Sequence, residues 1–323
     1  MILYSLAIIA GFALLVWSAD RFVEGAAATA KHLGMPTLLI GILVVGFGTS
    51  APEMVVSAIA AYEGNPSLAL GNAIGSNIVN IALILGVTAL VAPIAVHSKI
   101  VKKEIPLLIL IVLFAGFLLL DNSLTYIEGV LLLVGFFALV GWSIYAAIKG
   151  RGDRLEGEIE DELQEHAMSL KSGIIWLLIG LVLLIASSRV LVWGAVGVAT
   201  EFGVSDLIIG LTIVALGTSL PELAASVIAA RKGEHDIAIG NVVGSNMFNL
   251  LAVIGIATVI SPMDVIAPEV LQRDWIIMFA LTIALLVMTY GLKGKQGKIN
   301  KIKGTLLVLS YVAYNSYLGM SLI

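Results

Sequence analysis

The stretch GFGTSAPE at residues 46–53 returns in nearly the same form as ALGTSLPE at residues 215–222. Each copy places a glutamate and a proline inside a run that is otherwise apolar enough to lie in lipid. A shift of 169 residues aligns the chain with itself without a gap, and residues 37–86 and 206–255 then share 22 identities in 50 positions. The shift brings together Glu53 and Glu222, Gly71 and Gly240, and Asn80 and Asn249. The chain is therefore a duplication that repeats its polar residues.

The composition places the chain among membrane proteins. Of its 323 residues, 59% are hydrophobic and 12% are charged, and the mean hydropathy is +1.06. These values lie outside the range of soluble domains. Ten apolar stretches approach the ~20 residues that a helix needs to cross a bilayer. They lie near residues 2–30, 36–62, 68–92, 104–121, 125–148, 171–200, 206–230, 237–260, 273–291 and 304–322.

The first stretch is predicted to be a retained helix, because it lacks the basic start and the cleavage site of a signal peptide. Residues 149–172 form the only long polar segment, and we expect an acidic, solvated cytoplasmic linker there. The predicted organisation is thus a five-helix repeat at 1–148, the linker at 149–172 and a second five-helix repeat at 173–323.

The basic residues predict the orientation. Alternate loops hold 16 of the 18 lysines and arginines, and only Arg189 and Arg273 fall near the opposite side. By the positive-inside rule, the basic loops are cytoplasmic and both termini lie outside the cell. Since each half has five crossings, the second half enters the membrane from the other side. We therefore predict an all-α polytopic membrane protein with ten transmembrane helices in two inverted-topology repeats. Such repeats are the usual construction of secondary transporters, although duplication also builds scaffolds.

The repeated glutamates indicate a cation site. An acidic residue at the bilayer centre costs about 2.5–3.5 kcal/mol on insertion scales, so it normally faces a cavity or a partner. The helices that carry the repeated motifs hold no lysine or arginine at comparable depth. The absence of cysteine and the placement of all four histidines in or near loops argue against zinc, copper or iron. A mobile cation is then the expected counter-charge.

Oxygen atoms surround these glutamates in the sequence. The i, i+4 spacing places four pairs each on one helix face: Thr49 with Glu53, Ser76 with Asn80, Thr218 with Glu222, and Ser245 with Asn249. Hard cations such as Ca²⁺ and Na⁺ suit such a set. Pro52 and Pro221 cannot donate to the carbonyls of Gly48 and Gly217, so the helix is expected to kink or break beside each glutamate.

The GNxxGSN segments supply packing and hydrogen bonds in this interpretation. Two glycine pairs with small-xxx-small spacing are expected to let helices approach closely: Gly71 with Gly75, and Gly240 with Gly244. Asn77 and Asn246 are predicted to form hydrogen bonds between helices. For Ser57 and Ser226, a supporting role and a merely tolerated polar group are equally compatible with the sequence.

The paired GTSxPE and GNxxGSNxxN motifs, on two five-helix repeats, resemble the calcium/cation antiporter superfamily, particularly prokaryotic sodium/calcium exchangers. The resemblance covers essentially the whole chain. It implies a Na⁺/Ca²⁺ antiporter in the cell membrane of a prokaryote, with ions bound at the midplane between helices 2, 3, 7 and 8. It further implies that Glu53 and Glu222 coordinate Ca²⁺ and that six hydroxyls supply oxygens to Na⁺: Thr49, Ser50, Ser76, Thr218, Ser219 and Ser245. The backbone carbonyls of Gly46 and Ala215 match ligand positions of the family too.

One position departs from the family pattern. Several members carry an aspartate where this chain has Asn249, so asparagine stands in both halves, at 80 and 249. The site then has two negative charges rather than three, and the ion count stays open. Exchange of H⁺ for Ca²⁺ and K⁺-dependent exchange remain alternatives, and a cation channel or an intramembrane enzyme are alternatives of another class. The expectation is a transporter and not an enzyme, with Ca²⁺ and Na⁺ as transported substrates, no cofactor, no nucleic acid and no obligatory protein partner.

Overall fold

The computed structural model describes residues 1–35, 37–96, 103–149, 168–202, 215–290 and 297–321. The first half of the chain holds α1 (Ile2–Leu33), α2 (Thr37–Ile40), the π-helical η1 (Gly41–Gly46), α3 (Phe47–Thr49), α4 (Ala51–Tyr62), α5 (Pro66–Ile78), η2 (Val79–Ile84), α6 (Leu85–Val91), β1 (Ile94–Val96), α7 (Ile105–Leu118) and α8 (Tyr126–Lys149). The second half holds α9 (Leu170–Glu201), α11 (Ala215–Thr218), α12 (Leu220–Arg231), α13 (His235–Phe248), η5 (Asn249–Val253), α14 (Ile254–Ile260), η6 (Val270–Trp275), α15 (Ile276–Thr289), β2 (Gly297–Ile299) and α16 (Lys301–Ser321).

Helices occupy the predicted apolar stretches wherever these stretches are described. Within the described ranges, six helices are long and apolar enough to cross a membrane, or seven if the bent pair Leu38–Thr49 and Ala51–Tyr62 is one span. The chain is accordingly a helical membrane protein. The count of ten crossings and the inverted orientation of the repeats stay predictions. The first part of the stretch 206–230 and most of the predicted linker at 149–172 lie outside the described residues.

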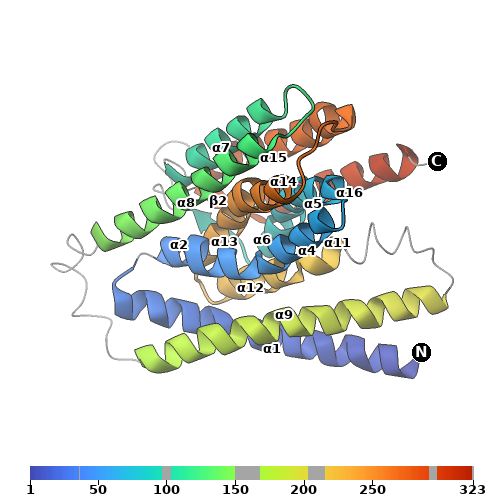
Figure 1. Ribbon diagram of the computed structural model, residues 1–323. Coiled ribbons are helices and arrows are strands. Elements are labelled where there is room, and N and C mark those ends of the chain that lie inside the picture. The colour runs from blue at the N-terminus through green and yellow to red at the C-terminus, as the bar shows by residue number, and fades with distance from the viewer. Residues whose placement is uncertain (36, 97–102, 150–167, 203–214, 291–296, 322–323) are drawn as a thin grey trace.

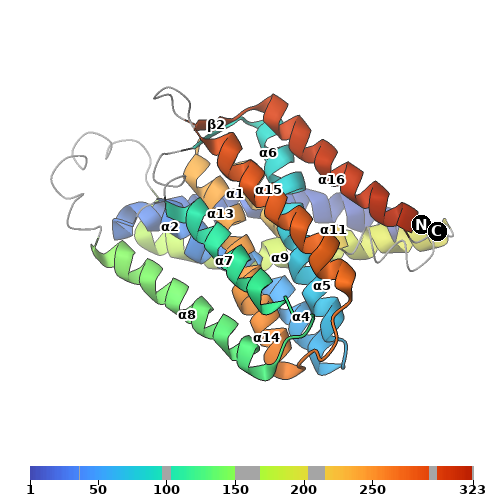
Figure 2. The same ribbon diagram turned by 90° about the horizontal axis from the view of Figure 1, so that it is seen from above.

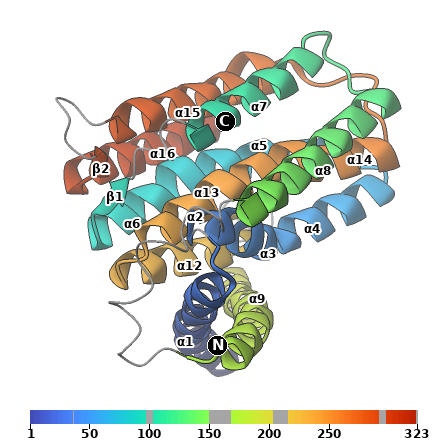
Figure 3. The same cartoon turned by 90° about the vertical axis from the view of Figure 1, so that its left-hand side faces the viewer.

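The two long helices α1 and α9 cross each other and form a layer of their own beneath the other helices (Figures 1 and 3). Four glycines bring their backbones together. A Cβ atom on Gly25 would lie 2.4 Å from the backbone nitrogen of Leu177, and one on Gly180 would lie 2.8 Å from the backbone of Phe22. Gly11 and Gly194 meet the opposite helix in the same way. Gly11 and Gly180, and Gly25 and Gly194, are equivalent under the shift of 169, so both halves contribute the same contact.

The core of the protein lies around α13, which is buried on all sides from Ile237 to Phe248. It packs against η1, α12 and α5. On the far side from α1 and α9, the helices α7, α8, α15 and α16 cover this core (Figures 2 and 3). The polar residues of the repeated motifs therefore lie between two outer layers, and Glu53 and Glu222 are buried there.

Two short strands correct the all-α prediction. β1 and β2 pair in antiparallel fashion, with Ile94 opposite Ile299 and Val96 opposite Gly297. They join the chain after α6 to the chain before α16 and lie at one end of the helices (Figure 2). With only three residues each, they are too short to show a reliable alternating pattern in the sequence.

Candidate functional site

Both repeated motifs break their helices next to the glutamate, as the sequence predicted. Ser50 separates α3 from α4 with ψ near 0°, and the two segments are bent by 42°. Ser219 separates α11 from α12 in the same way. The following proline is tolerated because the first turn of a helix needs no donated hydrogen bond. Each break places its glutamate in the first turn of the next helix, where the helix dipole favours a negative charge.

The carbonyl that Pro221 leaves free is satisfied by α9. The hydroxyl of Ser188 donates to the Gly217 carbonyl oxygen over 2.9 Å. Under the shift of 169, the equivalent of Ser188 is Ala19, whose methyl group cannot donate to Gly48. One of the two predicted free carbonyls is therefore engaged by protein, and the two breaks differ in how they are held.

The two carboxylates are buried together without a basic partner. Glu53 and Glu222 are each 1% exposed, and the charge of Glu53 acts directly on Glu222. Among the described residues, no lysine or arginine forms an ion pair with either carboxylate. Ser50, from the opposite repeat, donates to Oε1 of Glu222 over 3.2 Å. Hydroxyl groups offset the burial of two carboxylates only in part, so a bound cation would stabilise the cluster.

Oxygen atoms without a hydrogen-bond partner gather at these same residues. Nine buried side-chain atoms in the described part of the chain lack a partner. Five of them are oxygens of predicted site residues: Oε2 of Glu53, Oε2 of Glu222, Oδ1 of Asn80, Oδ1 of Asn249 and Oγ of Ser219. Buried polar groups are normally satisfied, so five unsatisfied oxygens on the repeated motifs need an explanation. A hard cation, which takes only oxygen ligands, would satisfy them.

The other predicted ligands lie beside this cluster. Thr49, fully buried, donates to the Val45 carbonyl over 3.0 Å, and Ser245 donates to the Gly46 carbonyl over 3.3 Å. Ser76 lies in α5 one turn before Asn80, and Thr218 ends α11 directly before the break. Ala215 begins α11, and nothing about its side chain is described. The structure therefore joins the two halves through Ser50 and Glu222 and through Ser245 and Gly46.

Asn241 is a central residue that the sequence prediction did not single out. It is fully buried, and its amide nitrogen donates to the Glu222 carbonyl oxygen over 3.1 Å and to Ser226 over 2.8 Å. Its amide oxygen accepts from Thr49 over 3.0 Å. Its equivalent in the first half, Asn72, donates to Ser57 over 3.1 Å. The signal in the sequence was the GN dipeptide, which is repeated in both halves. The hydrogen bonds of the two asparagines also assign Ser57 and Ser226 a supporting role.

The glycines of the two halves behave differently. Gly240 and Gly244 touch the backbone of α2 and η1, since an added Cβ would lie 2.9 Å from the Leu38 oxygen and 2.8 Å from the Ile42 oxygen. Gly71 and Gly75 have nothing within 4 Å of such a Cβ. The close-packing prediction is thus right for the second pair and wrong for the first.

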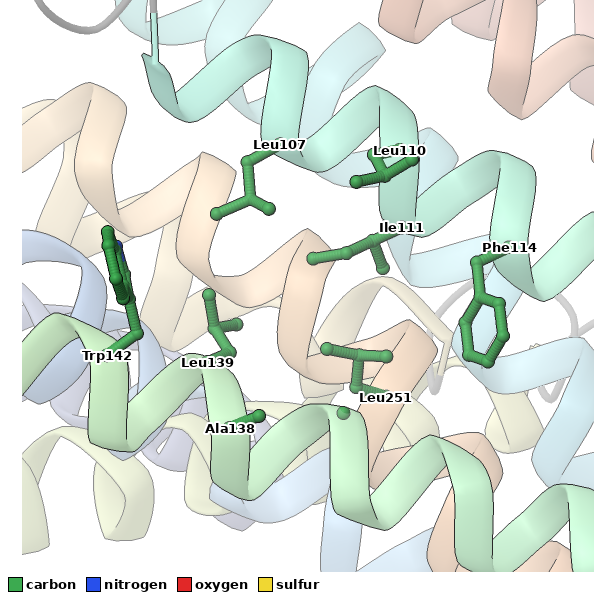
Figure 4. A pocket seen from close by; sticks show the side chains of 9 residues that line it. Leu107, Leu110, Ile111, Phe114, Ala138, Leu139, Trp142 and Leu251 are labelled. Carbon is green, nitrogen blue, oxygen red and sulfur yellow. The ribbon is translucent and has the colours of Figure 1, made fainter.

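Two other kinds of site find no support in the described residues. The described residues contain no group of three or more His, Cys, Asp or Glu side chains that could hold a metal ion. A separate pocket of about 570 Å³ opens between α7 and α8 (Figure 4), and its lining is apolar. It is formed by Leu107, Leu110, Ile111, Phe114, Gly135, Ala138, Leu139, Trp142 and Leu251. It offers no oxygen ligand and does not belong to the carboxylate cluster.

Known proteins resemble this chain over almost its whole length. The family described as "Sodium/calcium exchanger protein" matches residues 3–145 and 172–320. The provisionally named antiporter CaxA of Alkalimonas amylolytica is 47% identical, and the match covers 99% of this chain and all of that one. The sodium/calcium exchanger MaX1 of Methanosarcina acetivorans is 29% identical over 96% of both chains. A solved structure of the sodium-calcium exchanger NCX_Mj, soaked with Na⁺ and Ca²⁺, has a TM-score of 0.83 at 30% identity and covers 98% of both chains.

Proposed function

The chain belongs to the sodium/calcium exchanger family, as its paired motifs predicted, and on that premise we propose that it exchanges Na⁺ for Ca²⁺ by secondary active antiport. The observation that carries this proposal is the buried pair Glu53 and Glu222, which lacks a basic partner among the described residues and has one unsatisfied oxygen on each carboxylate. Two carboxylates balance one Ca²⁺ or two Na⁺. The NCX_Mj structures obtained with Na⁺ and Ca²⁺ support the same two substrates.

The two ions compete for the carboxylates in this mechanism. The cavity can change its access only when Ca²⁺ or Na⁺ neutralises Glu53 and Glu222, because closing a charged cavity in a medium of low dielectric is costly. Transport of Ca²⁺ in one direction is therefore coupled to transport of Na⁺ in the other, and transport of one ion alone is suppressed. The ions enter between α4, α5, α12 and α13, which carry the two glutamates and the two repeated asparagine segments.

Alternating access is supported by a difference between the two sides of the molecule. α1 packs along α12, whereas the described parts of α9 and α4, the equivalent pair under the shift of 169, make at most marginal contact. Lys232, which caps α12, forms ion pairs with Asp20 and Glu24 of α1 over 2.8 Å and 2.7 Å. Burial alone would lower the pKa of Lys232, but its hydrogen bonds with Asp20 and Glu24 outweigh that effect and raise the pKa. The lysine therefore stays charged, and this side is held closed.

The equivalent residues on the other side carry exchanged charges. Asp20 corresponds to Arg189, and Lys232 corresponds to Glu63. Both Arg189 and Glu63 are exposed, and neither has an ion-pair partner among the residues that the structure describes. An Arg189–Glu63 pair would close the other side when the Lys232 pairs open. By the positive-inside rule, Lys232 is cytoplasmic, both termini lie outside and the chain is open outward in the cell membrane of a prokaryote.

Removing the ion pairs of Lys232 should shift the equilibrium between a conformation with α1 packed on α12 and one with α1 detached. Partly exposed ion pairs contribute about 0.2–1 kcal/mol each, so losing both pairs in Lys232→Ala should raise the ratio of detached to packed α1 by roughly twofold to thirtyfold. Spin labels on cysteines introduced at Val16 and Arg231 report the distance between these helices, and the chain has no native cysteine to interfere. Lys232→Arg, which keeps the charge, should leave the distance distribution in place. An unchanged distribution in Lys232→Ala would contradict this part of the proposal.

The exchange itself is tested in proteoliposomes. We expect ⁴⁵Ca²⁺ to enter when an outward Na⁺ gradient is imposed and to stay out when only a K⁺ or an H⁺ gradient is present. Uptake that ignores Na⁺ and follows the pH gradient would assign the protein to H⁺/Ca²⁺ exchange. A requirement for K⁺ beside Na⁺ would assign it to K⁺-dependent exchange. This alternative stays open because asparagine at both 80 and 249 leaves the site with only two negative charges.

A further inference from the structure

Four buried asparagines form two crossed hydrogen bonds between the repeats. Asn80 donates through its amide nitrogen to Oδ1 of Asn246 over 3.0 Å. Asn249 donates in the same way to Oδ1 of Asn77 over 3.3 Å. All four side chains are at most 1% exposed. The two bonds are equivalent under the shift of 169, so the same arrangement occurs twice.

These bonds determine which end of each amide is available to an ion. A carboxamide has one oxygen, which accepts, and one nitrogen, which only donates. Because the nitrogens of Asn80 and Asn249 are engaged across the repeats, their oxygens are left over, and both oxygens are buried without any partner. A rotated amide would direct its N–H groups toward the ion and place its oxygen against the oxygen of Asn246 or Asn77.

One of the two acceptor residues is itself held in place. Asn77 donates through its nitrogen to the sulfur of Met278 over 3.4 Å, which keeps its oxygen directed at Asn249. Asn80 and Asn249 lie at the beginning of the π-helical turns η2 and η5. A π-helical turn widens the helix locally and is frequent at functional sites. Here each turn carries an asparagine that is bonded to the other repeat through its nitrogen and keeps a buried, unpartnered oxygen.

We propose that Asn77 and Asn246 are positioning residues that fix the amide orientation of Asn249 and Asn80, so that each presents an oxygen to the transported cation. This inference rests on the proposed function. It explains how a site with asparagine in both halves serves a cation: the neutral amides act as oxygen ligands only because a residue of the other repeat occupies their nitrogens. Asn77 and Asn246 do not touch the ion themselves.

The test is a double-mutant cycle on Ca²⁺ affinity, measured by isothermal titration calorimetry on the purified full chain. Asn246→Leu keeps the approximate size of the side chain and removes the acceptor oxygen. We expect it to weaken Ca²⁺ binding by about tenfold, the effect of losing roughly one oriented ligand. In an Asn80→Ala background, which lacks the amide to be oriented, Asn246→Leu should change the affinity less than about twofold. Thr88→Val, which removes another buried hydroxyl without a partner, serves as the control and should bind like the parent.

The outcomes separate a positioning role from a structural one. If Asn246→Leu weakens binding equally in both backgrounds, or leaves the affinity of a folded protein unchanged, the positioning role is wrong. If Asn246→Leu does not fold, the same cycle is run with Asn77→Leu and Asn249→Ala. Failure of the parent protein to bind Ca²⁺ would remove the proposed function itself, whereas a parent that binds and variants that show no coupling would remove only this inference.

Discussion

Replacing Glu53 with glutamine abolishes Na⁺-driven Ca²⁺ uptake in proteoliposomes, and this is the largest loss that we expect from any single substitution. The side chain keeps its shape and one oxygen, but the cavity keeps only the charge of Glu222. Removing one partner of a buried charge pair, here the carboxylate that would pair with the bound cation, costs about 2–5 kcal/mol, which corresponds to roughly 30-fold to several thousand-fold in affinity. Uptake of ⁴⁵Ca²⁺ under an imposed Na⁺ gradient measures the effect.

The control for this substitution is Glu269→Gln. Glu269 is exposed and lies immediately before η6, away from the carboxylate cluster, so the same chemical change should leave uptake near the parent rate. Glu222→Gln should behave like Glu53→Gln, because the two positions are equivalent in the repeats. Undiminished uptake in Glu53→Gln would reject the site assignment while leaving the family membership intact.

Replacing Gly25 with alanine should separate α1 from α9 and lower both the thermal stability and the transport rate. Glycine to alanine normally stabilises a helix by up to about 1 kcal/mol. At Gly25 the added methyl would lie 2.4 Å from the Leu177 nitrogen and 2.7 Å from the Gly173 oxygen, and backbone atoms cannot move aside as a side chain can. Overpacking of this kind costs about 1–3 kcal/mol, so this substitution should destabilise the protein instead of stabilising it.

The matched control is Gly141→Ala in α8, where nothing lies within 4 Å of the new methyl. We expect Gly141→Ala to melt at or slightly above the parent temperature and Gly25→Ala to melt below it. Fluorescence-detected size-exclusion chromatography after heating gives both melting temperatures in detergent. Equal melting temperatures would show that the close contact between α1 and α9 does not contribute to stability.

The motifs themselves carried most of what the sequence could predict. A glutamate repeated at a fixed interval, a proline beside it and hydroxyls one helical turn away are local patterns, and local patterns predict helix breaks and ligand types. The breaks at Ser50 and Ser219 are where the prolines placed them. The predicted interhelical bonds of Asn77 and Asn246 are present as well.

What the sequence could not supply depends on which segments meet in space. The role of Asn241 requires Thr49 of one half to lie against Glu222 of the other, and no spacing within a helix encodes that contact. The bond from Ser188 to Gly217 joins two helices through a residue that the repeat does not conserve. The π-helical turns at Asn80 and Asn249 shift the register of a helix without any proline or glycine to mark them.

The hydrogen bond between Ser188 and Gly217 also makes the two repeats differ in how firmly their helix breaks are held. The break before α12 is tied to α9, whereas Ala19 cannot tie the break before α4 to α1. The second break is therefore held by one hydrogen bond more than the first. In the proposed exchange cycle the two breaks do not deform at equal cost, so we expect the transport rate to change when the ion gradients are reversed, although the ligands are nearly symmetric.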